Sequence, residues 1–297
     1  MSALAIDVRG LRRSYGPLEA VAGVDLQVGF GEVFALLGPN GAGKTTTTEI
    51  LEGYRDRSGG EIRVLGVDPA DAGPAHRARV GIVLQSTGVD PHLTVRETLA
   101  MYAGYYPSPR DVDEVLALVG LDRPGTRVRR LSGGQQRRLD VAVALVGDPD
   151  LLFLDEPTTG FDPGARRAAW DMVRNLAAIG KTVFLTTHFM DEAQAVASRV
   201  AVIAHGRIVA EGPPATLGGR DVASTTIRFR AAATPPLAAA SRRPDGTWEL
   251  RTEDAARSLH ALTTWALGAG ESLDGLEVHR PTLEDVYLAL TGDGDGT

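Results

Sequence analysis

Three short segments of the chain carry residues that could bind and hydrolyse a nucleotide. They read GPNGAGKT at residues 38–45, LSGGQ at residues 131–135 and LLFLDE at residues 151–156. A glycine-rich loop that runs into a helix presents backbone N–H groups to phosphate oxygens, and an acid at a strand end can hold the magnesium ion that bridges them. The types and order of these residues therefore predict nucleotide hydrolysis.

The glycine-rich loop has the residues that phosphate contacts need. Its glycines let the backbone approach the phosphates, Lys44 can reach the β and γ phosphates, and the Thr45 hydroxyl can ligate Mg²⁺. The loop follows the apolar run VFALL, which is typical of a central strand. Lys44 and Lys181 are the only lysines in the chain, which favours a specific need for a compact ammonium at position 44. The predicted nucleotide-binding loop comprises Gly38, Pro39, Asn40, Gly41, Ala42, Gly43, Lys44, Thr45 and Thr46.

Two consecutive acids close the third segment. Asp155 ends the apolar run, where its carboxylate can hold Mg²⁺ directly or through water. Glu156 is the next residue and is expected to point elsewhere, because successive side chains of a strand alternate in direction. The two carboxylates are therefore expected to do different work.

Together the three segments resemble those of the ATPase subunits of ABC transporters, and LSGGQ between the other two is the most specific of them. The resemblance implies ATP and Mg²⁺ as cofactors, with Glu156 as the catalytic base that polarises the attacking water. It also implies that Lys44 takes part in catalysis and that His188, after the strand TVFLTT, hydrogen-bonds the γ phosphate and positions the water. The magnesium ligands it implies are Thr45, Gln85 and Asp155.

Smaller matches extend the resemblance to adenine binding and to the dimer interface. Tyr15 would stack on adenine, Gln85 would also face the membrane partner, and Asp162 would lie across the interface, although Phe161 stands where leucine is usual. The signature segment would bind the γ phosphate of ATP held by the opposite subunit, which implies an ATP-dependent, head-to-tail homodimer. On its own, Ser132 could equally be an ordinary helix cap. The signature residues are Leu131, Ser132, Gly133, Gly134 and Gln135.

The apolar patterns around these segments predict an α/β fold. Helices alternating with apolar strands after residue 150 indicate a mainly parallel sheet covered on both faces, as in the P-loop NTPase core of ABC ATPases. Alternating patterns at residues 4–9 and 24–28 predict antiparallel strands at the N-terminus, and residues 86–148 are expected to form a helical subdomain. The run RIVAEG is expected to add a final hairpin strand.

A proline- and glycine-rich stretch at residues 212–221 predicts a boundary between two domains. We expect a nucleotide-binding domain at 1–217 and a small α+β accessory domain at 222–297 that ends in a disordered tail, GDGDGT. The predicted elements of the small domain are strands at 225–230, 246–252 and 276–280 and helices at 254–267 and 283–290.

Composition limits the partners. With 31 basic against 38 acidic residues the net charge is −7, so nucleic acid is not an expected partner. There is no cysteine, and the five histidines other than His188 show no spacing that would assemble a metal site. No signal peptide and no run of about 18 apolar residues is visible, so we expect a soluble, cytoplasmic chain on the inner face of the membrane, with the transport path in a separately encoded transmembrane permease.

Two further blocks bear on the branch of the family. VGIVLQSTGVDPHLTVRETL and the C-terminal PTLEDVYLALTG are similar to bacterial drug-export ATPases of the daunorubicin-resistance type, which implies export of a drug, antibiotic or lipophilic compound. The apolar stripe of the second block could instead be core of the small domain. The alternatives are an importer or lipid-flippase ATPase and, less favoured, a soluble ABC ATPase, because no long coiled coil separates the motifs and only one cassette is present.

Overall fold

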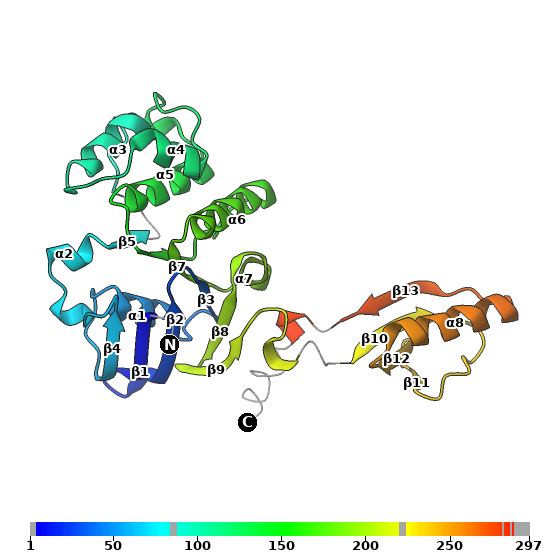
Figure 1. Cartoon of the computed structure of the whole chain (residues 1–297). Coiled ribbons are helices and arrows are strands. Elements are labelled where there is room, and N and C mark those ends of the chain that lie inside the picture. The colour runs from blue at the N-terminus through cyan, green and yellow to red at the C-terminus, as the bar shows by residue number, and fades with distance from the viewer. Residues whose placement is uncertain (1–3, 84–87, 220–223, 281, 286, 288–297) are drawn as a thin grey trace. The chain divides into compact units, whose positions relative to one another are not determined.

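The computed structural model describes residues 4–83, 88–219, 224–280, 282–285 and 287. The chain divides into two compact units, Met1–Pro214 and Ala215–Thr297 (Figure 1). Gln85 and the GDGDGT tail lie outside the described residues. In the part of the chain that the structure describes, every helix is too short or too polar to span a bilayer.

A six-stranded sheet forms the centre of the first unit. Its order is β5-β6-β7-β3-β8-β9, and all neighbours are parallel except β8 and β9. The apolar runs predicted as strands form β3, β6, β7 and β8, whose side chains are almost all buried, as in strands covered on both faces. The strands are β3 (Val33–Leu37), β5 (Val80–Val83), β6 (Leu151–Asp155), β7 (Thr182–Thr187), β8 (Arg199–Ala204) and β9 (Arg207–Gly212).

Aromatic rings fill the middle of this sheet. The ring centres of Phe34 and Phe184 lie 5.7 Å apart, and those of Phe153 and Phe184 lie 5.5 Å apart. All three side chains are fully buried and belong to the neighbouring strands β3, β7 and β6. This packing holds together the three strands whose ends carry the predicted catalytic residues.

A second, antiparallel sheet with the order β2-β1-β4 confirms the N-terminal prediction and extends it. Its strands are β1 (Leu4–Tyr15), β2 (Leu18–Gly29) and β4 (Gly59–Val64). The sequence pattern did not predict β4, because it opens with two glycines, which are typical of a turn. The sheet needs the second of them: a Cβ on Gly60 would lie 2.5 Å from the Gly10 carbonyl oxygen.

The region between the glycine-rich loop and the segment LLFLDE contains the helical subdomain predicted at residues 86–148. Thr94 and Glu97 form a capping box at the start of α3, and Gly120 ends α4 in a left-handed conformation. The helices of the first unit are α1 (Lys44–Leu51), α2 (Pro74–Arg77), α3 (Val95–Ala103), α4 (Val112–Val119), α5 (Gly133–Leu145), α6 (Pro163–Ala178) and α7 (Met190–Val196), with short 3₁₀ turns at η1 (Pro69–Asp71) and η2 (Val128–Arg130).

The second unit is a small antiparallel sheet with the order β11-β12-β10-β13, packed against one helix. Ile227, Phe229, Trp248, Leu250 and the helical Leu262 form its core. Its elements are η3 (Leu217–Gly219), β10 (Thr225–Arg230), β11 (Ala240–Arg242), β12 (Trp248–Thr252), α8 (Ala255–Ala269) and β13 (Asp274–His279). The three-residue β11 was not predicted, and residues 283–285 and 287 are helical where a helix was expected.

Candidate active site

The site lies at the carboxyl ends of three neighbouring strands. Strand β7 pairs in parallel with β6 on one side and β3 on the other. Lys44 follows β3 through the glycine-rich loop, Glu156 follows β6, and His188 follows β7. Because the carboxyl ends of parallel strands meet at one edge of the sheet, residues distant in sequence come together there.

The phosphate loop is shaped by glycines that no other residue could replace. Gly43 has φ 105°, and a Cβ there would lie 2.5 Å from the Ala20 carbonyl oxygen. A Cβ on Gly38 would run into the carbonyl oxygen of Ile203. Helix α1 then starts with no side-chain cap and no acid in its first turn. Its first N–H groups are therefore left for an anion.

Lys44 is held inside the loop. Its Nζ donates to the carbonyl oxygens of Gly38 at 2.8 Å and Pro39 at 3.1 Å and lies 3.6 Å from Glu156 Oε1. The side chain is only 4 % exposed. Burial lowers the pKa of the Lys44 ammonium, and the carboxylates of Glu156 and Asp155 oppose that effect. The Lys44 ammonium is thus held by the carbonyl oxygens of Gly38 and Pro39, which phosphate oxygens would replace.

The two acids point apart, as expected. Thr186 Oγ1 donates to Asp155 Oδ1 at 2.5 Å, whereas the Glu156 carboxylate accepts from Thr159 Oγ1 at 3.1 Å and lies near Lys44. Glu156 has φ 43°, a left-handed conformation that is rare for a side-chain-bearing residue. Such strain at a strand end is a feature of positions where a side chain must be aimed.

His188 contacts the second acid. Its Nδ1 lies 3.2 Å from Glu156 Oε1. Burial acts to raise the pKa of the Glu156 carboxyl, but His188, Lys44 and Thr159 together lower it below its ordinary value. Glu156 is therefore ionised at neutral pH and able to accept a proton.

The hydrogen bonds of the signature segment are separate from these contacts. Ser132 caps α5, its Oγ accepting from the Gln135 N–H at 3.3 Å, while Gln135 Oε1 accepts from the Ser132 N–H at 3.0 Å. Both side chains are exposed, and within the described chain they bond to each other and not to the phosphate loop. A hollow of about 260 Å³ opens beside them, lined also by Phe161 and Ala165.

Tyr15 and Asp162, two further predicted site residues, both have polar partners. Tyr15 is 37 % exposed, its hydroxyl accepts from Arg55 Nη1 at 2.5 Å, and the Arg13 guanidinium lies 4.7 Å from its ring centre. Asp162 caps α6 and accepts from the N–H groups of Gly164 and Ala165 at 2.8 and 2.9 Å. Arg55 was not among the predicted site residues, because nothing in the spacing of the sequence links it to Tyr15.

Arg137 is a second residue that the sequence analysis missed. Its Nη2 donates to the Asp155 carbonyl oxygen at 2.7 Å, although it lies on α5, two residues after the signature segment. A signal was present: Arg137 precedes the buried Val141 and Ala144 by four and seven positions, so a charged residue occupies the apolar stripe of its helix.

Known proteins share this fold and these segments. The family described as ABC transporter matches residues 21–159, and the family described as ABC transporter domain-containing protein-like, C-terminal domain, matches residues 225–282. The Nod factor export ATP-binding protein I of Paraburkholderia xenovorans is 40% identical over 303 residues, covering 98% of each chain. The protein of the same name from Rhizobium leguminosarum bv. viciae is 40% identical, over 98% of this chain and 96% of its own.

The chain belongs to the family of ABC transporter ATP-binding subunits. It is an ABC-type ATPase whose activity is coupled to transport. Among solved structures, cbiO1 from Clostridium perfringens, part of the ABC transporter complex cbiONQ, matches with a TM-score of 0.65 at 28% identity, over 71% of this chain and 89% of its own. An ATP-binding cassette in its ADP conformation matches with a TM-score of 0.64 at 23% identity, which shows the shared fold.

This ABC ATPase also has a groove beside the helical region, with a volume of about 530 Å³. Tyr54, Tyr102 and Tyr106 line it together with Glu52, which follows α1. Burial, then the nearby charges of Asp155 and Glu49, raise the pKa of the Glu52 carboxyl to about 8. The groove is therefore aromatic, with one acid close to Asp155 at the end of β6.

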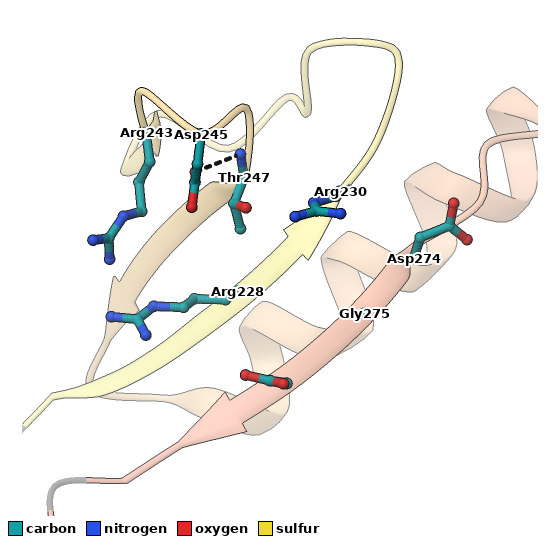
Figure 2. Close-up of a pocket in the computed structure, with 8 residues that line it drawn as sticks. Arg228, Arg230, Arg243, Asp245, Thr247, Asp274 and Gly275 are labelled. Atoms are coloured by element: carbon teal, nitrogen blue, oxygen red, sulfur yellow. Dashed lines mark hydrogen bonds between the residues drawn. The ribbon is translucent and has the colours of Figure 1, made fainter.

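The second unit carries a hollow of about 420 Å³ on the charged face of its sheet (Figure 2). Arg228 and Arg243 both donate to Glu249, at 3.0 and 2.8 Å. Asp245 accepts from the Thr247 N–H at 3.0 Å, the dashed contact in Figure 2. Positive and negative side chains lie next to one another here and form ion pairs. The hollow therefore does not favour a ligand of one charge.

Within the described residues, no group of three His, Cys, Asp or Glu side chains could hold a metal ion. A magnesium ion would instead rely on the Thr45 hydroxyl and the Asp155 carboxylate, which are hard oxygen donors of the kind that Mg²⁺ takes together with substrate phosphates. The third predicted ligand, Gln85, lies outside the described residues. The donors present thus fit a nucleotide-bound Mg²⁺.

Proposed function

We propose that this ABC ATPase powers an exporter by binding and hydrolysing ATP at the site formed by Lys44, Asp155, Glu156 and His188. The observation that carries the proposal is the contact of one carboxylate, Glu156, with both a buried ammonium and an imidazole. An ionised acid, a phosphate-binding lysine and a histidine at one edge of a parallel sheet are the parts that ATP hydrolysis needs.

Binding begins with the phosphate loop. The first N–H groups of α1 cradle the phosphates, and Lys44 exchanges the Gly38 and Pro39 carbonyls for phosphate oxygens. Thr45, Asp155 and Gln85 would hold Mg²⁺, whose positive charge would offset that of the nucleotide phosphates. Tyr15 stacks on adenine, with its hydroxyl already oriented by Arg55. Each of these groups binds without itself reacting.

Hydrolysis then depends on Glu156. Its lowered pKa keeps the carboxylate ionised, so that it can accept the proton of the attacking water. His188, beside it, hydrogen-bonds the γ phosphate and so fixes the phosphate and the base relative to each other. Lys44 stabilises the negative charge that develops on the transferred phosphoryl group.

The active unit is a head-to-tail homodimer closed by ATP. Support comes from the signature segment, whose exposed Ser132 and Gln135 contact each other and leave the N-terminus of a 13-residue helix, α5, facing outward. A helix N-terminus binds phosphate, and the γ phosphate of a second subunit fits that role. Asp162 lies across the same interface. One chain then supplies half of each site.

Closure of the dimer drives motion in a separately encoded transmembrane permease. Because the chain binds this permease, it lies at the inner face of the membrane. The aromatic groove of Tyr54, Tyr102 and Tyr106 suits an inserted helix of that permease. The names of the relatives, which are Nod factor export proteins, favour export, and the substrate we propose is a drug, antibiotic or other lipophilic compound, as in the daunorubicin-resistance type. The predicted domains 1–217 and 222–297 act as nucleotide-binding and accessory domains.

The direct test replaces the base. Glu156→Gln should lower ATP turnover about 10²- to 10⁴-fold while ATP binding, measured by equilibrium titration, stays close to the starting value. Glu114→Gln, an exposed acid on α4, is the matched control and should leave both unchanged. Wild-type turnover in Glu156→Gln would remove this residue from its role and, with it, the proposed site.

The permease contact has its own test. Charge substitution at two exposed tyrosines should release the chain from membranes that contain its permease: Tyr54→Glu in the groove (67 % exposed), and Tyr105→Glu (75 % exposed), whose ring packs edge-on against Tyr102 of the groove. Basal ATPase activity should stay within about twofold, because neither side chain reaches the phosphate site. Sedimentation with membrane vesicles measures the first effect. Membrane association that survives both substitutions would contradict docking at this groove.

A further inference from the structure

The peptide bond between Asp155 and Glu156 is held at both of its polar ends. Its N–H, on Glu156, donates to the backbone oxygen of Thr186 at 3.2 Å and to its Oγ1 at 3.1 Å. Its carbonyl, on Asp155, accepts from Arg137 Nη2 at 2.7 Å. The orientation of this one peptide sets where the Glu156 side chain begins, and the left-handed φ of 43° shows that the backbone there does not relax to an ordinary conformation.

The hydrogen-bond partners of this peptide come from different parts of the molecule. Thr186 belongs to β7, the strand beside β6, and so is part of the same rigid sheet. Arg137 belongs to α5, which begins at the signature segment and whose capping box joins Ser132 to Gln135. The guanidinium is 9 % exposed and lies 3.9 Å from Asp140 on the same helix. It is therefore buried against the sheet and moves with α5.

We infer that Arg137 is a positioning residue for hydrolysis, which ties the signature helix to the peptide that aims Glu156. The inference rests on the proposed role of Glu156 as the base. When the signature segment engages a nucleotide and α5 shifts, the Asp155 carbonyl follows the guanidinium, and the base turns with it. Each subunit's own hydrolysis thereby depends on whether its signature helix is occupied.

The chemistry of the side chain suits this task. A planar guanidinium offers several fixed donors, so it can hold the carbonyl with one N–H group while others face Asp140. Without the guanidinium the carbonyl loses a charge-assisted hydrogen bond, and the strained peptide would be held less firmly. Arg138, the next residue, donates to the Gly120 carbonyl at 2.8 Å and so makes the same kind of bond toward the helical region, away from the base.

This pair of neighbouring arginines provides the test. Steady-state ATPase measurements on Arg137→Met should show kcat reduced about 10- to 100-fold with KM for ATP changed less than about twofold, because misplacing a catalytic group lowers rate without removing binding contacts. Arg137→Lys, which keeps one donor, should recover most of the rate. Arg138→Met is the control and should keep kcat within about twofold.

A double-mutant cycle separates positioning from general damage. If Arg137 acts through Glu156, then adding Arg137→Met to Glu156→Gln should reduce the residual rate less than about twofold. The inference is overturned if Arg137→Met matches Arg138→Met, if KM rises as much as kcat falls, or if the loss is the same in both backgrounds. Glu156→Gln with wild-type turnover would instead overturn the proposed function itself, so the two failures are distinguishable.

Discussion

At the scale of single residues, the phosphate loop shows that two glycines with the same backbone preference can be needed for different reasons. Gly41 and Gly43 both have left-handed φ values, 82° and 105°. Open space surrounds the position of a Cβ on Gly41, but one on Gly43 would lie 2.5 Å from a backbone oxygen of β2. Only Gly43 is therefore required by close packing as well as by conformation.

This difference predicts the outcome of two alanine substitutions. Gly41→Ala should cost about 1 to 2 kcal/mol of stability, from the left-handed conformation alone. Gly43→Ala should cost that amount plus about 1 to 3 kcal/mol for the overlap with Ala20, and should abolish ATP binding. Urea unfolding and nucleotide titration measure the two effects. Gly66→Ala, with φ 83° and open space, is the control outside the loop. Equal costs at 41 and 43 would contradict the packing argument.

Residue-scale contacts also mark the limit of sequence analysis. The motif residues Lys44 and Glu156 were predictable, because each follows an apolar run at a fixed spacing. The donors that orient them were not: Thr186 and Arg137 reach the Asp155–Glu156 peptide across the fold, from 31 and 18 positions away from Asp155. Such contacts depend on how a helix packs on a sheet, which no local pattern encodes.

At the scale of elements, the prediction succeeded where burial was uniform and failed where glycine was needed. Strands β3, β6 and β7 are unbroken apolar runs, and each was found at its predicted place. Strand β4 opens with Gly59 and Gly60, and the sheet accepts them because β1 approaches too closely for a side chain at position 60. The two glycines are typical of a turn, but here they belong to a strand, β4, that lies very close to β1.

The end of α1 gives an element-scale prediction about pH. The Glu52 pKa of about 8 lies above its ordinary value of 4.5, so the folded protein keeps a proton that the unfolded chain releases. Stability should therefore fall as pH rises from about 4.5 to 8, by roughly 2 to 4 kcal/mol after allowance for solvent screening. Glu52→Gln should remove most of this slope. Urea midpoints at pH 6 and 8.5 would measure it.

Controls for this prediction come from the same unit. Glu61→Gln, an exposed acid on β4, should leave the pH slope unchanged. Glu52 shares its groove with His76 and Arg77, so those two side chains are kept intact throughout the series. A slope that persists in Glu52→Gln would assign the pH dependence to other carboxyl groups.

At the scale of the whole molecule, the proposed homodimer would divide the nucleotide contacts between two copies of the chain. The phosphate loop and the acids meet at one edge of the sheet, whereas the signature segment contacts none of them within the described chain. In the proposed dimer, the exposed signature segment of each copy would complete the nucleotide site of the other.

Dimer formation is accordingly predicted to require both nucleotide and signature. Glu156→Gln, which binds ATP without consuming it, should sediment as a dimer when ATP is added and as a monomer without it. Adding Ser132→Arg should abolish the dimer, because a bulky side chain would fill the phosphate approach, while binding to the phosphate loop persists. The proposal fails if the protein stays monomeric at saturating ATP, or if it still forms a dimer when Ser132→Arg is present.

The scarcity of lysine has a practical consequence for watching this cycle. Of the two lysines, Lys181 is paired with Asp148 at 2.7 Å and is 12 % exposed, and Lys44 sits inside the loop at 4 %. The lowered pKa of Lys44 leaves a larger share of it as the free amine, which is the form that acylating and carbamylating reagents attack. A brief pulse of such a small reagent should therefore modify Lys44 more slowly when nucleotide covers it, and mass spectrometry of the peptide that contains Lys44 would measure the difference.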